Sequence, residues 1–284
     1  MAKMDTVSVN AYAKVNFTLD VVGRAGGYHL LDSLVCTVGL FDRVTVRRAD
    51  GVRVRMTGEG AASIAAGSNA ERAARAFCAA FGGGADIVIE RAIPVGAGLG
   101  SSSADAAGVL RALAKLYGIP DMVCLKSLAD SLGSDTGYLL TGGWARMTGR
   151  GEQVSPLAGM PPLWLLLLLP EGGVSTPACF AAFDRMGEAY PPVTERAIAL
   201  LQQGNAEGAR LFGNALTKAA CSLCAGTEHS LAAARRLGAD GAGMTGSGSA
   251  VYAAFFSEEA CRAAQAAYAG KAAAMCVRTV AQIV

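Results

Sequence analysis

The chain has 284 residues, of which 52% are hydrophobic and 17% are charged. This composition supports a large buried core and excludes an intrinsically disordered chain, and the length suits two packed domains. The formal net charge of +2 gives no electrostatic footprint for nucleic acid or for an anionic membrane surface, so we expect neither as a partner.

The sequence carries no pattern that predicts export or a membrane anchor. Residues 1–20 alternate polar and apolar side chains and lack a continuous apolar region. The most apolar run, 163–169, lies between Pro162 and Pro170; it is too short to span a bilayer and predicts a buried central strand. We therefore expect a cytoplasmic protein whose eight cysteines are reduced. Cys221 and Cys224 are not followed by a second CxxC, which argues against a zinc site.

The first half of the chain alternates between strand and helix patterns. Strands are predicted at 6–11, 17–22, 43–48, 52–56 and 86–90. Ala49-Asp50-Gly51 is typical of a turn and predicts a hairpin between 43–48 and 52–56. Helices are predicted at 70–81, from the end of the segment 94–103 through Tyr117, and at 122–132.

The second half begins near residue 156 and again interleaves strands with helices. The predicted strands are 163–169, 250–256 and 274–280, and the predicted helices are 177–186, 193–203, 206–224, 229–237 and 257–269. A glycine-rich turn is expected at 241–248. The patterns predict an α+β or α/β fold with an N-terminal domain at 1–156 and a C-terminal domain at 157–284.

A glycine- and serine-rich loop follows the strand at 86–90 and opens a helix. Phosphate oxygens need several converging N–H donors, which glycines allow by close backbone approach and which a helix N-terminus supplies. The spacing is neither the Walker pattern nor GxGxxG. A plain turn with a serine cap would account for one glycine and one serine, not for three of each. The candidate ATP-binding residues are Pro94, Val95, Gly96, Ala97, Gly98, Leu99, Gly100, Ser101, Ser102, Ser103 and Ala104.

Three segments together are similar to a known superfamily. The loop 94–104 (PVGAGLGSSSA), the segment 11–19 (AYAKVNFTL) and the segment 243–252 (GMTGSGSAVY) resemble, in order, the motifs of the GHMP kinases, which include galactokinase, homoserine kinase and mevalonate kinase. The resemblance implies an ATP-dependent kinase of α+β class, with an N-terminal ribosomal-protein-S5-like domain and a C-terminal ferredoxin-like domain.

Further segments resemble one branch of this superfamily. They are 27–33 (GYHLLDS), 133–136 (GSDT), 142–152 and 173–180. The resemblance implies transfer of the ATP γ-phosphate to the 2-hydroxyl of a cytidine diphosphate conjugate of methylerythritol, on the non-mevalonate route to isoprenoid precursors. Two alternatives stay open: a GHMP kinase of the homoserine or mevalonate type, and a non-catalytic ATP-binding regulator of the same fold.

The resemblance assigns the catalytic pair to Lys14 and Asp135. Asp135 would accept the proton of the hydroxyl or orient it. Lys14 would favour the ionised carboxylate and lower the cost of negative charge on the attacking oxygen. Taken alone, Asp135 could cap a helix after Gly133 and Lys14 could be a solvated strand lysine; the three motifs in order favour the catalytic assignment.

The same resemblance assigns the substrate-binding residues. Asn16 would contact the polyol or the catalytic pair. Tyr28 and Phe180 would sandwich a cytosine ring between aromatic faces, and His29 would read its edge, the alternative for His29 being a surface turn. Thr176 and Pro177 would line the same pocket. Mg²⁺ is expected with ATP; Ser103 or a neighbour could contact it, and its ligands are otherwise unassigned.

Overall fold

The computed structural model describes residues 5–60, 67–187 and 190–283. At its centre is β3 (Tyr28–Arg48), a long strand that hydrogen-bonds to strands from both halves of the chain. Its partners are β1 (Thr6–Asn16), β2 (Thr18–Ala25), β5 (Ala85–Arg91), β6 (Ala145–Gly149) and β12 (Ala273–Val280). One sheet therefore runs through the whole molecule.

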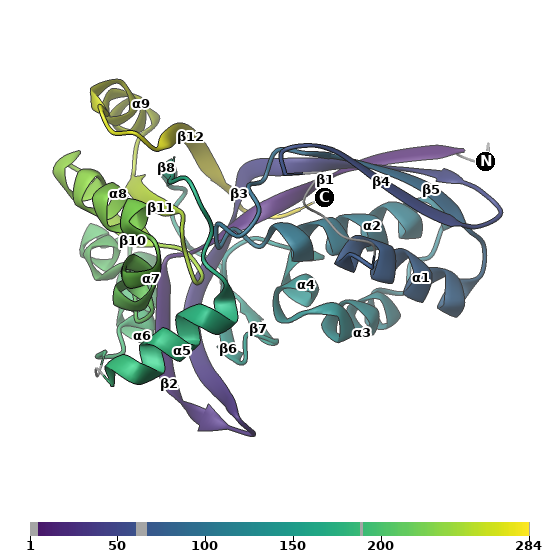
Figure 1. The fold of residues 1–284 in the computed structure, drawn as a ribbon, viewed down its shortest axis with the longest axis horizontal. Coiled ribbons are helices and arrows are strands. Elements are labelled where there is room, and N and C mark those ends of the chain that lie inside the picture. The colour runs from purple at the N-terminus through teal and green to yellow at the C-terminus, as the bar shows by residue number, and fades with distance from the viewer. Residues whose placement is uncertain (1–4, 61–66, 188–189, 284) are drawn as a thin grey trace.

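Four helices lie together along the N-terminal strands, as Figure 1 shows. They are α1 (Asn69–Phe81), α2 (Ser101–Tyr117), α3 (Met122–Leu132) and α4 (Ser134–Leu139). The 17-residue α2 is the innermost, packed against β1 and β3, and nearly all of its side chains are buried. This burial fixes the N-terminus of α2, and thus the glycine- and serine-rich loop, against the sheet.

The C-terminal half is built on the leucine run. β8 (Trp164–Leu169) lies between β11 (Val251–Phe255) and β12, and β10 (Gly241–Met244) forms the edge. Leu165 to Leu168 are fully buried, as expected for a strand covered on both faces. Helices α8 (Ala225–Arg236) and α9 (Glu258–Ala267) pack on these strands, and α7 (Thr217–Leu223) packs between α8 and α5 (Thr176–Met186). Helix α6 (Thr194–Gln202) lies against β2 and β3 instead (Figure 1).

The predicted hairpin between 43–48 and 52–56 is wrong. β5 lies between β3 and β4 (Val52–Gly58), antiparallel to the first and parallel to the second. Ile87 and Ile89 of β5 are fully buried, whereas β4 alternates half-buried residues with exposed ones such as Arg53 and Arg55. The more apolar strand takes the inner position, and the charged strand takes the edge, where its polar face stays in water.

The helix predicted at 206–224 is also wrong. The segment forms a 3₁₀ helix (Ala206–Leu211), the short strand β9 (Gly213–Asn214) and then α7. β9 pairs in parallel with β2, and the Asn214 side chain donates to the carbonyls of Met244 and Gly246. These long-range bonds outweigh local helix propensity. Likewise, the first four residues of the predicted turn 241–248 form β10, and α4, β6 and β7 (Gln153–Pro156) were not predicted.

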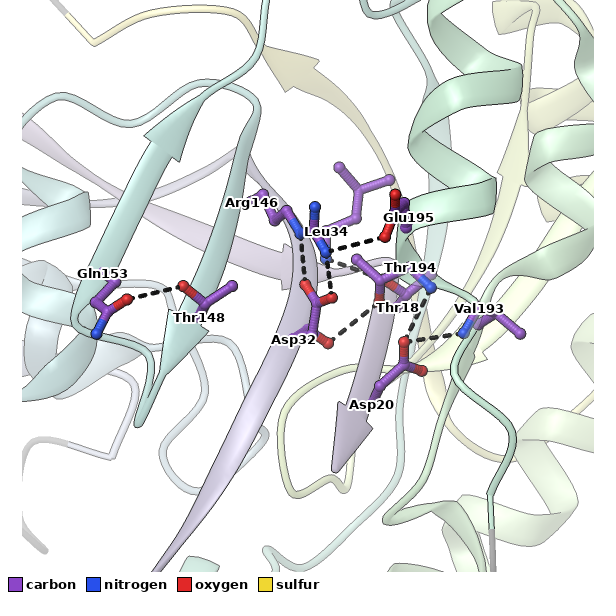
Figure 2. A network of polar contacts seen from close by, with 10 residues as sticks. All are labelled: Thr18, Asp20, Asp32, Leu34, Arg146, Thr148, Gln153, Val193, Thr194 and Glu195. Carbon is purple, nitrogen blue, oxygen red and sulfur yellow. Dashed lines mark hydrogen bonds and ion pairs between the residues drawn. The ribbon is translucent and has the colours of Figure 1, made fainter. Parts of the chain in front are cut away.

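A polar network joins α6 to β2 and β3, as Figure 2 shows. The guanidinium of Arg146 donates to both carboxylate oxygens of Asp32, at 2.8 and 2.7 Å. Oδ2 of Asp20 accepts from the backbone N–H groups of Val193 and Thr194, both at 2.9 Å. A buried carboxylate at a helix N-terminus is favoured by the helix dipole, so the network fixes α6 against the N-terminal half.

The last described residues return to the N-terminal half. Thr279 and Val280 of β12 pair with β3, and the N–H of Ile283 donates to the carbonyl of Thr141. The division into domains 1–156 and 157–284 stays a prediction. Within the described ranges, no helix combines the length and the apolar character needed to cross a bilayer.

We predict that Gly108→Ala destabilises the protein even though alanine favours helices. An added Cβ at Gly108 would lie 2.7 Å from Cβ of Ala11 and 2.9 Å from Cγ2 of Val44, and overpacking outweighs the gain in propensity. We expect a loss of about 1–2 kcal/mol in the free energy of unfolding, measured by urea titration. Gly51→Ala, where an added Cβ meets no atom within 4 Å, is the control; equal stability of the two variants would contradict the packing argument.

Candidate active site

A cleft of about 410 Å³ lies where the two halves of the chain meet. Residues from all three superfamily motifs line it. Of the predicted site residues, the lining includes Lys14, Asn16, Pro94, Val95, Gly96, Ala97, Gly98, Leu99, Gly100, Ser101, Ser102, Ser103, Asp135, Thr176 and Phe180. Ala104 is buried inside α2 instead. Three predicted site residues, Tyr28, His29 and Pro177, are not among the described residues that line the cleft.

The glycine- and serine-rich loop is held by its carbonyl groups. The carbonyls of Gly96, Ala97 and Leu99 accept from the backbone N–H groups of Val174, Ala250 and Lys14, at 3.0–3.1 Å. The carbonyl of Gly98 accepts from the hydroxyl of Thr245 at 3.2 Å. Across the described ranges, the N–H groups of 96–103 donate to no protein acceptor. The loop therefore retains a row of free donors at the N-terminus of α2, which is the arrangement that binds phosphate.

Two glycines of the loop are required by close contacts. Gly98 has φ +76°, and an added Cβ would lie 2.2 Å from the carbonyl oxygen of Thr245. Gly100, also at φ +76°, is the N-cap of α2, and its Cβ would lie 3.1 Å from Cγ of Lys14. Larger residues at either position would therefore be strained and would push the loop away from its neighbours.

The predicted catalytic pair meets in the cleft. Nζ of Lys14 on β1 lies 3.4 Å from Oδ2 of Asp135, in the first turn of α4. Lys14 is only 5% exposed, which excludes a solvated strand lysine. The N-cap of α4 is Gly133, without a side-chain capping bond, so the carboxylate of Asp135 is left to face the lysine.

A chain of polar side chains orients Lys14. Its Nζ donates to Oδ1 of Asn16 at 2.5 Å, and Nδ2 of Asn16 donates to Oγ of Ser33 at 2.8 Å. The Ser33 hydroxyl in turn donates to the carbonyl of Thr18. All of these side chains are buried, and a fully satisfied buried network holds a charged group in one position. Asn16 thus contacts the predicted catalytic pair through Lys14.

A buried charge cluster that the sequence analysis missed lies beneath the loop. The guanidinium of Arg91 donates to the hydroxyl of Ser101, and its Nε lies 3.5 Å from Asp105 and 3.7 Å from Asp42. Asp42 also accepts from the N–H groups of the two residues that follow Arg91. Burial, together with the neighbouring Asp42, raises the pKa of Asp105 to about 8. The protonated form of Asp105 is therefore favoured, and the charge of Arg91 lies beside that of Asp42.

Aromatic side chains gather beside the cleft. The rings of His29 and Phe180 are stacked, with centroids 4.5 Å apart and an interplanar angle of 21°. Tyr28 is 59% exposed, and the guanidinium of Arg150 lies 5.0 Å from its ring centroid. The proposed cytosine sandwich between Tyr28 and Phe180 stays a prediction. Thr176, at the start of α5, contacts the hydroxyl of Ser247 at 2.9 Å, and Pro177 lies beside it, exposed.

The described residues contain no cluster of three or more His, Cys, Asp or Glu side chains that could hold a metal ion. Mg²⁺ is commonly bound by one or two carboxylates together with substrate phosphates, so a protein-only cluster is not required. The oxygen-bearing side chains that line the cleft include the Asp135 carboxylate and the hydroxyls of Ser101–Ser103. The ligands of the expected Mg²⁺ stay unassigned.

Two family descriptions match the chain: "GHMP kinases N terminal domain" over residues 68–144 and "GHMP kinases C terminal" over residues 190–273. The 4-diphosphocytidyl-2-C-methyl-D-erythritol kinase of Moorella thermoacetica is 36% identical over 266 residues, covering 88% of this chain and 90% of that protein. The kinase of the same name from Cereibacter sphaeroides is 39% identical over 261 residues, covering 89% and 91%.

This chain belongs to the GHMP kinase family. A crystal structure of 4-(cytidine 5'-diphospho)-2C-methyl-D-erythritol kinase matches it with a TM-score of 0.81 at 33% identity, covering 96% of this chain and 98% of that one. The homoserine kinase of Cytophaga hutchinsonii matches with a TM-score of 0.75 at 20% identity, covering 100% and 97%, which shows the shared fold alone. The comparisons confirm the resemblance inferred from the three motifs and the α+β GHMP kinase fold.

As a GHMP kinase, the protein uses ATP as its phosphate donor. The residues that the motifs did not reveal as functional are Arg91, Asp105, Thr245 and Asn214. Arg91 and Asp105 had a weak signal, because they flank the loop 94–104 closely in the sequence. Thr245 lies within the motif 243–252, but neither it nor Asn214 has a local signal that reports its long-range contacts.

We predict that the stability of wild type relative to Asp105→Asn falls as the pH rises from 5 to 8. The folded-state pKa of Asp105 is about 8, above the unfolded value of about 4. In this window only the folded state keeps the proton, so wild-type stability decreases with pH, by at most about 1.4 kcal/mol per unit. Asparagine mimics the protonated acid and lacks this slope. Urea titrations at several pH values measure it; parallel curves for the two proteins would contradict a raised pKa.

Proposed function

We propose that this protein transfers the γ-phosphate of ATP to the 2-hydroxyl of 4-diphosphocytidyl-2-C-methyl-D-erythritol, a step in non-mevalonate isoprenoid precursor synthesis. The observation that carries the proposal is the position of the Lys14–Asp135 pair in the same cleft as a loop with unpaired N–H groups. Relatives named for this activity cover nearly the whole chain.

The cleft suits phosphoryl transfer by positioning and charge stabilisation. We propose that the N–H groups of 96–103 and the dipole of α2 bind the triphosphate. Asp135 then orients the substrate hydroxyl and accepts its proton, while Lys14 stabilises the negative charge that develops on the attacking oxygen. Bound Mg²⁺ would neutralise the phosphate oxygens, as ATP-dependent transfer generally requires.

Aromatic residues beside the cleft favour a nucleotide substrate over homoserine or mevalonate. Phe180 lines the cleft, and His29 and Tyr28 lie next to it on β3. Small aliphatic alcohols have no planar ring to stack on these side chains, whereas base–aromatic stacking contributes about 1–3 kcal/mol per base. The structures of homoserine and mevalonate kinases share the fold at only 20% and 18% identity.

The proposal is tested by incubating the protein with ATP, Mg²⁺ and the cytidine substrate and recording the mass of the substrate by mass spectrometry. We expect a gain of one phosphate group, with homoserine and mevalonate unchanged in parallel incubations. Phosphorylation of either of those alcohols instead would favour the other kinase type. No ADP release above that of Asp135→Asn with any alcohol would favour a non-catalytic ATP-binding protein.

Asp135→Asn should lower turnover by at least about a hundredfold, the scale of a lost general base. ATP affinity should be unchanged, because the loop at 96–103 supplies the proposed phosphate contacts. Steady-state rates and nucleotide titrations measure the two effects separately. Turnover equal to that of wild type would remove Asp135 from the catalytic role.

Tyr28→Ala should weaken binding of the cytidine substrate and leave ATP binding unchanged. Loss of one stacking face predicts an increase in KM of about tenfold. Phe256→Ala, which removes another exposed aromatic ring, at the end of β11, is the control and should leave both KM values unaltered. An equal rise in both KM values for Tyr28→Ala would contradict the stacking role.

A further inference from the structure

Two cysteine side chains meet between α9 and β12. Cys261 on α9 is fully buried, and Cys276 on β12 is partly exposed. Sγ of Cys261 lies 3.0 Å from Sγ of Cys276, and Sγ of Cys276 also donates to the backbone carbonyl of Cys261 at 3.4 Å. Both residues are free cysteines. The two thiols are therefore in direct contact without a covalent bond between them.

A second contact fixes the register between α9 and β12. One helical turn beyond Cys261, Nε2 of Gln265 donates to the backbone carbonyl of Ala274 at 3.0 Å. Ala274 lies two residues before Cys276 on β12, so the helix and the strand run in opposite directions past each other. The same helix also packs on β8 and β11. Because α9 is held along its length against the sheet, Cys261 stays opposite Cys276.

We propose that Cys261 and Cys276 form an oxidation site, at which a small disulfide of the glutathione class converts the two thiols into one reversible disulfide bond. The S–S bond length is about 2.05 Å, so the two sulfur atoms need to approach each other by only about 1 Å. The native packing thus brings the sulfur atoms close to bonding distance before any oxidant arrives. Neither cysteine is among the described residues that line the cleft, so the site is independent of the proposed kinase activity.

The reaction consists of two thiol–disulfide exchanges. The thiolate of Cys276 attacks one sulfur of the small disulfide, forms a mixed disulfide with it and releases one small thiolate. Cys261 then attacks Sγ of Cys276 and releases the second small thiolate. Each cysteine loses one proton and each released thiolate takes one up, so two small thiols are formed. Burial raises the pKa of the Cys261 thiol, and the exposed edge of Cys276 makes it the first nucleophile.

Peptide mapping identifies the cross-link directly. The purified full chain is incubated with glutathione disulfide, the remaining thiols are alkylated, and the protein is cleaved with trypsin. Cleavage after lysine and arginine places Cys261 and Cys276 on separate peptides, 237–262 and 272–278, each with one cysteine. We expect these two peptides to be recovered joined to each other and without glutathione, and we expect dithiothreitol to separate them.

Two variants control for unspecific oxidation. Cys276→Ser, which changes a partly exposed side chain, should abolish the joined peptides. The double variant Cys221→Ser and Cys224→Ser should retain them; these two cysteines are also half-buried and lie three residues apart at the end of α7. Recovery of both peptides from oxidised wild type as alkylated thiols would overturn the proposal. A glutathione adduct that persists on Cys276, or pairing of Cys261 with another cysteine, would do the same.

Thermal unfolding tests whether the bond fits the native packing. The cross-link closes a loop of about 15 residues and restricts the unfolded chain, so we expect oxidation to raise the midpoint of wild type by about 5 °C. The same treatment should leave the midpoint of Cys276→Ser unchanged. A wild-type midpoint that does not rise would overturn the proposal, because the bond would then form only at the expense of the native packing.

Discussion

The hydroxyl of Thr245 is the contact on which the arrangement of the cleft depends. It accepts a hydrogen bond from the backbone N–H of Asn16 and donates one to the carbonyl of Gly98. One buried side chain thus joins three segments that are far apart in sequence, and its loss would leave a buried N–H without a partner. Asn214 holds the same turn from the other side through the carbonyls of Met244 and Gly246.

This constraint has a chemical consequence for the loop at 96–103. The loop carbonyls are bonded to neighbouring segments, whereas the N–H groups of the loop are not, so these N–H groups stay available for an anion. The buried cluster beneath the loop supports this, because Arg91 lies beside Asp42 and burial raises the pKa of Asp105, which favours its neutral form. A second buried carboxylate charge here would oppose the binding of phosphate.

The long strand β3 connects the predicted catalytic pair with the aromatic residues beside the cleft. It carries His29 near one end, pairs with β1 opposite Lys14, and is joined to α6 by the Asp32–Arg146 network. Because both halves of the chain are hydrogen-bonded to the same strand, relative motion between the phosphate loop, the Lys14–Asp135 pair and the aromatic cluster is restricted. Rigid support of this kind is what positional catalysis needs.

The sequence by itself determined the family, the position of the glycine- and serine-rich loop before a helix, and most helices and strands, because short-range periodicity, glycine spacing and ordered motifs are local properties. The resemblance also paired Lys14 with Asp135, and these two side chains lie 3.4 Å apart; their catalytic role stays a prediction. Only the tertiary structure decided that β5 lies between β3 and β4, that 206–224 is not one helix, and that Arg91 and Thr245 contact the loop at 96–103. These outcomes depend on contacts between strands and side chains that are far apart in the sequence, and short-range sequence patterns do not report such contacts.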